Sequence, residues 1–134
     1  MGHNAERLYA KIMQEAGFTH CKTTRNTSRL LDACKIDLNF LPVLIQIKAG
    51  NQKGMNPSTI LRQITEELQK NYPPMEDIHK KPRAIIHHKR LEEGTNRRKD
   101  TDAIVHMTFN DFLTLMVAYN KQLEYDFQSN TRRD

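Results

Sequence analysis

The sequence predicts a single α/β domain, a mixed β-sheet flanked by helices, with its elements in the order α-β-β-β-α-β-β-α. Short runs rich in β-branched residues, of which Val43–Lys48 is the clearest, indicate strands. Apolar residues that recur every three to four positions indicate helices at both ends and in the middle of the chain. With 134 residues and no visible repeat, we expect one domain over residues 1–128 and a polar tail over residues 129–134.

The first part of the chain predicts a helix followed by a strand. The helix is expected over Ala5–Ala16, with Asn4 as its cap and Gly17 as its end. Phe18–Thr24 is the predicted strand, and the polar stretch Arg25–Arg29 is predicted to be a loop.

The second part predicts a helix and two more strands. Asn56 followed by Pro57 is a favourable helix start, because a capping residue precedes a proline at the first helical position. The core face of this helix is expected to hold Ile60, Leu61, Ile64 and Leu68. Strands are expected over Arg83–His88 and Asp102–Met107, joined by a basic loop.

A closing helix follows the last strand. Its apolar residues recur at helical spacing and are expected to pack in the core: Phe109, Phe112, Leu113, Met116, Leu123 and Phe127. Four further apolar residues lie outside this stripe and indicate a partner surface: Leu115, Val117, Tyr119 and Tyr125. Two-fold dimers are the commonest oligomers, so the chain is expected to be a homodimer. The alternative is that these four residues pack under the connector at 75–81.

The chemistry of the chain is concentrated in a predicted hairpin. Its first strand centres on Ile36-Asp37-Leu38 and its second is Val43–Lys48. Because side chains alternate along a strand, Gln46 and Lys48 share one face, and Asp37 can lie beside them. A carboxylate and an amide oxygen are ligands of the kind that Mg²⁺ prefers. The alternative is a solvated face of an amphipathic hairpin.

Ile36-Asp37, followed by Gln46-Ile47-Lys48, resembles the core motif of the PD-(D/E)XK nuclease superfamily. The order of elements is similar to that of the small Holliday-junction resolvases of archaea and phages, which also begin with a helix that carries a Glu, here Glu6. The resemblance implies a restriction-endonuclease-like sheet and an endonuclease that hydrolyses DNA with Mg²⁺ or Mn²⁺, including branched DNA in recombination. It also implies a homodimer, no small-molecule cofactor and no covalent intermediate.

The resemblance also implies roles for individual residues. Asp37 and Gln46 would bind the metal through side-chain oxygens, the carbonyl of Ile47 would join them, and Glu6 would add a second carboxylate. Lys48 would position the attacking water and stabilise charge on the phosphoryl group. The chain departs from the pattern at Gln46, where the family has an acid, and this departure favours the alternative of a catalytically degenerate nucleic-acid-binding module of the same fold.

The net charge of +5 favours a polyanionic partner, with DNA first. The stretch from Lys80 to Lys99 holds eight Lys or Arg residues and two acids. The candidate DNA-binding residues are Arg25, Arg29, Lys53, His87, His88, Lys89, Arg90, Arg97, Arg98 and Lys99. The alternative for the basic stretch is a solvated loop.

No apolar run approaches the ~20 residues needed to cross a bilayer, and the start of the chain lacks the pattern of a secretion signal. We therefore expect no membrane partner and a cytoplasmic location; the resemblance to the resolvases implies a host or phage-infected cell. Cys21 and Cys34 are expected to be buried free thiols; a zinc site that includes them and His20 is the weaker alternative.

Overall fold

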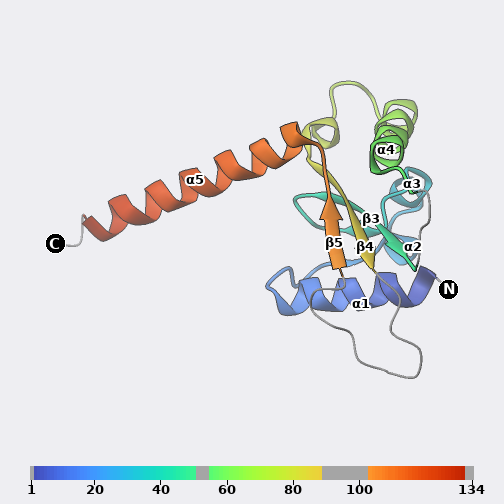
Figure 1. The fold of residues 1–134 in the computed structure, drawn as a ribbon, viewed down its shortest axis with the longest axis horizontal. Helices are drawn as coiled ribbons and strands as arrows, with labels where there is room; N and C mark the ends of the chain where they lie inside the picture. The colour runs from blue at the N-terminus through green and yellow to red at the C-terminus, as the bar shows by residue number, and fades with distance from the viewer. Residues whose placement is uncertain (1, 51–54, 89–102, 132–134) are drawn as a thin grey trace.

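A computed structural model describes residues 2–50, 55–88 and 103–131 of the chain. Within them, five strands form one sheet in chain order (Figure 1). The strands β3 and β4 are parallel, and the other neighbouring pairs are antiparallel. The strands are β1 (Lys22–Thr23), β2 (Leu38–Asn39), β3 (Leu44–Ala49), β4 (Arg83–His88) and β5 (Ala103–His106).

Helices surround this sheet, so the predicted α/β class and the mixed, helix-flanked sheet are confirmed. Figure 1 shows α1 on one side of the sheet and α4 on the other, while α5 extends away from both. The helices are α1 (Gly2–Glu15), α2 (Thr24–Thr27), α3 (Arg29–Ala33), α4 (Pro57–Asn71), the short 3₁₀ helix η1 (Asp77–Lys80) and α5 (Phe109–Thr131).

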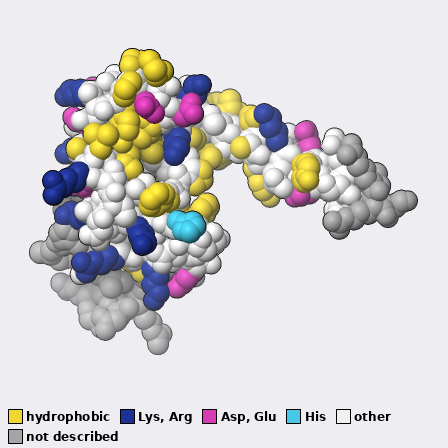
Figure 2. Space-filling model, turned by 180° about the vertical axis from the view of Figure 1, so that it is seen from behind, with side chains coloured by type: hydrophobic (Ala, Val, Ile, Leu, Met, Phe, Trp, Pro, Cys, Tyr) yellow, Lys and Arg dark blue, Asp and Glu magenta, His cyan; other side chains and the backbone are white. Residues whose placement is uncertain are grey.

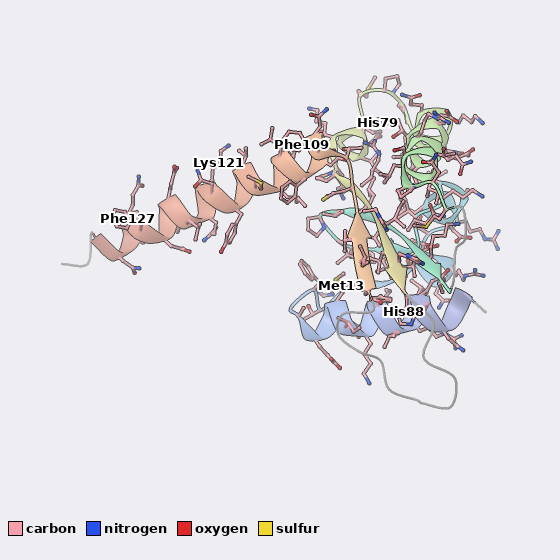
Figure 3. The ribbon with its side chains drawn as sticks, in the orientation of Figure 1. Met13, His79, His88, Phe109, Lys121 and Phe127 are labelled. Atoms are coloured by element: carbon pink, nitrogen blue, oxygen red, sulfur yellow. The ribbon has the colours of Figure 1, made fainter. Side chains whose placement is uncertain are left out.

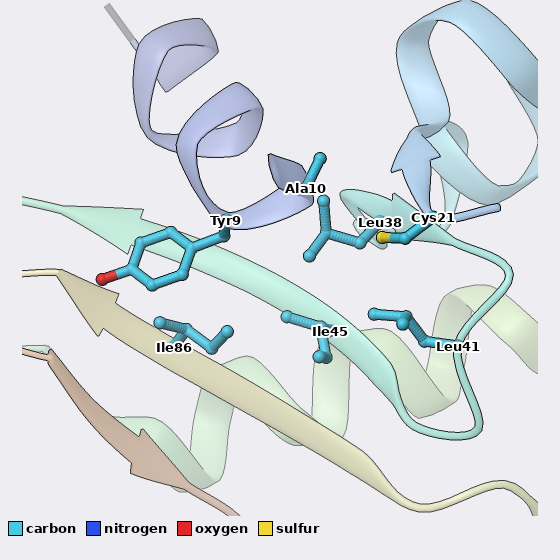
Figure 4. Close-up of a cluster of buried hydrophobic side chains, with 7 residues drawn as sticks. All are labelled: Tyr9, Ala10, Cys21, Leu38, Leu41, Ile45 and Ile86. Carbon is cyan, nitrogen blue, oxygen red and sulfur yellow. The ribbon is translucent and has the colours of Figure 1, made fainter. Parts of the chain in front are cut away.

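One half of the core lies between α1 and the sheet (Figure 4). Tyr9 and Ala10 of α1 pack in one cluster with Ile45 of β3 and Ile86 of β4. Ile47 packs against the same cluster. The sequence expectation that Ile45 and Ile47 share a face of the sheet is therefore confirmed.

The other half lies between α4 and the sheet, where Ile36 and Leu44 pack against Ile64 and Leu68. Because neighbouring strand residues point to opposite faces, the side chains of Gln46 and Lys48 follow Leu44 towards this side. The two thiols are buried and free as expected, and they belong to opposite halves of the core, Cys21 with the α1 cluster and Cys34 with the α4 cluster.

Two of the expected elements have the predicted bounds. The strand Arg83–His88 is found as predicted, and α4 begins at Pro57 with Asn56 as its cap. The side chain of Asn56 accepts a hydrogen bond from the backbone N–H of Thr59 at 3.3 Å. These elements carry clear local signals: a cap with a proline in α4, and the apolar centre Ala84–Ile86 in the strand.

The segment between α1 and β2 differs from the prediction. Of the expected strand Phe18–Thr24, only Lys22 and Thr23 pair in the sheet, because Gly17 adopts a φ of +117° and the chain turns at once. The expected loop Arg25–Arg29 instead contains α2 and the start of α3. Ser28 ends one helix and caps the next, since its hydroxyl accepts from the N–H of Leu31 at 3.2 Å.

The prediction that the closing helix packs in the core is wrong. The six apolar residues assigned to the core are all exposed, with Phe109 73% and Phe127 72% accessible. Figure 2 shows these apolar side chains along an arm that leaves the body. The helix continues to Thr131 and so includes the first residues of the predicted tail. A repeating apolar pattern predicts a helix, but it does not predict what covers that helix.

The start of α5 is nevertheless fixed to the body. Asp111 accepts a hydrogen bond from the backbone N–H of Arg83 at 3.1 Å, and its own N–H donates to the hydroxyl of Thr108 at 3.2 Å. Although α5 has 23 residues, no helix in the described ranges combines the length and apolar content that crossing a membrane requires.

Candidate active site at the start of the hairpin

Backbone hydrogen bonds hold Asp37 at the point where the chain enters the hairpin. Its N–H donates to the carbonyl of Ile45 at 2.8 Å, and its carbonyl accepts from the N–H of Thr24 at 2.9 Å. Thr24 is fully buried, and its hydroxyl donates to the carbonyl of Ile36 at 2.6 Å. Although β2 is short, the position of Asp37 is therefore set from both sides.

The carboxylate of Asp37 lies against β3. Its Oδ2 accepts from the N–H of Ile47 at 2.7 Å. The pKa of Asp37 is raised from 3.8 to about 6, mainly by burial and also by the negative charges of Glu6 and Asp32; the Ile47 hydrogen bond and Lys48 act in the opposite direction. Asp37 is thus within electrostatic range of both Glu6 and Lys48.

Glu6 reaches this region from α1. It is only 6% exposed, and its Oε2 accepts from Arg25 Nε at 3.0 Å. Arg25 had been assigned to DNA binding, whereas the structure places its guanidinium against Glu6 with 46% of the side chain still exposed. A buried carboxylate without such a partner would carry a large desolvation cost.

Gln46 has the least satisfied polar side chain of the candidate set. The residue is 8% exposed, and its Oε1 has no hydrogen-bond partner among the described residues. Leaving a buried amide oxygen unpaired costs about 1–3 kcal/mol. Lys48, two residues along the same strand, shares its face and is half-buried.

The two histidines of β4 face opposite sides of the sheet. His87 stands beside Lys48 in the parallel register, and its Nε2 lies 2.9 Å from the carbonyl of Gly50. His88 lies against α1, with its Nδ1 at 2.8 Å from the hydroxyl of Tyr9. Their side chains therefore do not converge on one point.

The remaining DNA-binding candidates divide into two groups. Arg29 is exposed at the start of α3, one helix after Arg25 in α2. The other candidates lie outside the described residues, namely Lys53, Lys89, Arg90, Arg97, Arg98 and Lys99. Their role stays a prediction.

The donor chemistry around Asp37 suits a hard cation. The candidate ligands are all oxygens, from two carboxylates (Asp37 and Glu6), one amide (Gln46) and the carbonyl of Ile47. Within the described ranges, no three His, Cys, Asp or Glu side chains gather as a ready metal site. A metal here would therefore depend on the amide oxygen that the protein leaves unpaired.

Three residues of this region were not identified from the sequence. Thr24 fixes the backbone of Asp37, Asp32 adds negative charge near it, and Tyr9 positions His88. Thr24 ends the predicted strand, and Asp32 follows the predicted loop Arg25–Arg29; in the structure they belong to α2 and α3. The one sequence signal for Thr24 is that a polar residue stands there next to residues that are buried.

Comparisons of the chain with protein families, with curated proteins and with solved structures gave no match.

Proposed function

We propose that the chain is a metal-dependent endonuclease of restriction-endonuclease-like topology that hydrolyses phosphodiester bonds in DNA. The observation that carries the proposal is the buried Oε1 of Gln46, which has no hydrogen-bond partner among the described residues and lies on the strand face that also carries Lys48. A buried amide oxygen of this kind is suited to a cation, and an ammonium group nearby is suited to a phosphate.

In this proposal, Asp37 and Gln46 supply side-chain oxygens to Mg²⁺ or Mn²⁺, the carbonyl of Ile47 joins them, and Glu6 contributes the second carboxylate. When bound, the ion withdraws charge from the phosphate and activates water. Lys48 holds the attacking water in line and stabilises the negative charge that develops on the phosphoryl oxygens. The histidines of β4 and the basic residues at 89–99 contact the DNA backbone.

The raised pKa of Asp37 is compatible with this role. At pH 7.5 a group with a pKa of about 6 is mostly ionised, and a bound cation would lower that raised pKa. Protonation competes with the metal below pH 6, so activity is expected to rise with pH through that range with a slope near one proton.

The test is cleavage of linear, flapped and four-way DNA with Mg²⁺, with EDTA as the control. Lys48→Ala is expected to lose cleavage and to keep its fold and most of its DNA affinity, because one phosphate contact among many contributes little to affinity. Wild-type turnover by Lys48→Ala would disprove the catalytic role of this residue.

The second candidate is a DNA-binding module without activity. It is favoured by Gln46 at the position of an acid and by the pairing of Glu6 with Arg25, which leaves fewer free charges for a metal. Retention of DNA without products, at every Mg²⁺ and Mn²⁺ concentration, would identify the chain as such a module.

A further inference from the structure

The helix α5 has apolar side chains on nearly all sides, yet the body covers little of it. Beyond the stripe described above, Val117, Tyr119 and Tyr125 are also exposed. A helix that is apolar all round is normally buried in a protein interior. The exposed apolar arm in Figure 2 therefore indicates a surface that binds a partner.

The spacing of the apolar stripe indicates what this partner is. Within α5, positions 109, 113, 116, 120, 123 and 127 follow one another in alternating steps of four and three, which is the spacing of a coiled-coil seam. Five of these six positions are apolar, and position 120 is Asn. The series is symmetric about position 118, so it is the same when read from either end. Two such helices placed antiparallel would match Phe109 with Phe127 and Leu113 with Leu123.

We propose that α5 pairs antiparallel with α5 of a second copy of this chain, centred on position 118. At the middle of the seam, Met116 meets the partner's Asn120. A polar residue at a seam position of this kind fixes register at some cost in stability. The contact is isologous, as a two-fold dimer requires.

The antiparallel orientation is favoured by the shape of the molecule. Phe109 lies where α5 leaves the body, and Phe127 lies near the far end (Figure 3). Parallel helices would bring two bodies to the same end, whereas antiparallel helices place one body at each end. The partner's Phe127 then reaches a cavity of about 500 Å³ at the start of α5, whose lining includes Leu61, Val105 and Phe112.

The exposed area is sufficient for a stable contact. The large apolar side chains along the seam are each about half exposed or more, and two copies together offer on the order of 1,200 Å², the lower end of stable interfaces. The inference does not depend on the proposed nuclease activity, and its test contains no nucleic acid.

Cysteine cross-linking tests both the pairing and its direction. The double variant Leu113→Cys/Leu123→Cys is expected to form a covalent dimer on mild oxidation, and so is a mixture of the two single variants. Each single variant alone is expected to remain uncross-linked, because its two copies of the same residue would be separated by about 15 Å along the pair. The native thiols do not interfere, since Cys21 and Cys34 are fully buried.

The same spacing prevents a bridge within one helix, so a covalent product reports a second chain. Cross-linking of each single variant alone would show parallel pairing and overturn the proposal. Light scattering provides the second measurement, on the unmodified chain. A dimer mass is expected at micromolar concentration, whereas 15.7 kDa at every concentration would overturn the pairing. Leu113→Glu should dissociate the dimer, and Gln122→Glu, off the seam, should not.

Discussion

Asp37 is expected to destabilise the fold at neutral pH, in keeping with a group retained for binding rather than for packing. Its pKa is about 6 in the folded chain against 3.8 for an ordinary aspartate. The ionised form is therefore less favourable in the folded than in the unfolded state. The stability associated with the protonated carboxyl is complete below about pH 4 and is lost as the pH rises through 6.

The substitution Asp37→Asn removes the loss of stability that ionisation of Asp37 causes. A shift of two pKa units corresponds to about 3 kcal/mol, and partial exposure of the carboxylate reduces the expected gain to about 2 kcal/mol at pH 7.5. The amide retains the shape of the side chain, and its oxygen still accepts from the N–H of Ile47. The variant should therefore be more stable than the wild type at pH 7.5 and nearly equal to it at pH 4.

Urea denaturation followed by far-UV circular dichroism measures this difference. For a chain of this size, about 2 kcal/mol moves the midpoint upward by about 1 to 2 M urea. The exposed Asp77→Asn is the matched control and should change stability by less than about 0.5 kcal/mol at either pH. Equal midpoints for wild type and Asp37→Asn at pH 7.5, or a gain that persists at pH 4, would refute the argument.

Two further predictions concern the ligands and the DNA. Gln46→Glu adds a negative charge to the proposed metal site, so calorimetry should show tighter Mg²⁺ binding than in the wild type; unchanged or weaker affinity would place position 46 away from the ion. Reversing the charges of Arg97 and Arg98 together should flatten the salt dependence of DNA binding by about two units of slope in log affinity against log salt, because each phosphate contact on duplex DNA contributes roughly 0.9. An unchanged slope would assign these two residues to solvent.

The parts of the fold that the sequence predicted are those with local signals. The cap at Asn56 and the strand Arg83–His88, with its apolar centre Ala84–Ile86, depend on neighbouring residues alone, and both elements have the predicted bounds. The short helices α2 and α3 were missed because their geometry depends on the hydroxyls of Thr27 and Ser28, which bond to nearby backbone groups. Such side chains are equally typical of loops.

The candidate site shows the same division. The strand alternation placed Gln46 and Lys48 on one face without reference to the rest of the chain. The pairing of Glu6 with Arg25 joins residues 19 positions apart on different helices, and no pattern along the chain predicts it. The position of α5 was mistaken for a similar reason, since an apolar pattern along a helix does not determine whether the body of the chain covers that helix.

The last prediction concerns the ion pair between Glu6 and Arg25. Arg25→Gln removes the cation and leaves Glu6, which is 6% exposed, beside the charge of Asp37. Without metal, the variant is expected to lose about 1–2 kcal/mol of stability, at the lower end for a broken pair because Arg25 is half exposed. Arg29→Gln, on the exposed surface of α3, is the control and should change little.

Mg²⁺ distinguishes a structural pair from part of a metal site. If Glu6 contributes to the site, the cation takes over the neutralising role of Arg25 in the variant. Mg²⁺ then faces two unpaired carboxylates in Arg25→Gln, whereas in the wild type one of the two is already paired with Arg25, so the variant binds the ion more strongly. Mg²⁺ should then raise the melting temperature of Arg25→Gln by more than that of the wild type. An equal rise in both proteins would remove Glu6 from the ligand set and leave Asp37 as the single carboxylate of the site.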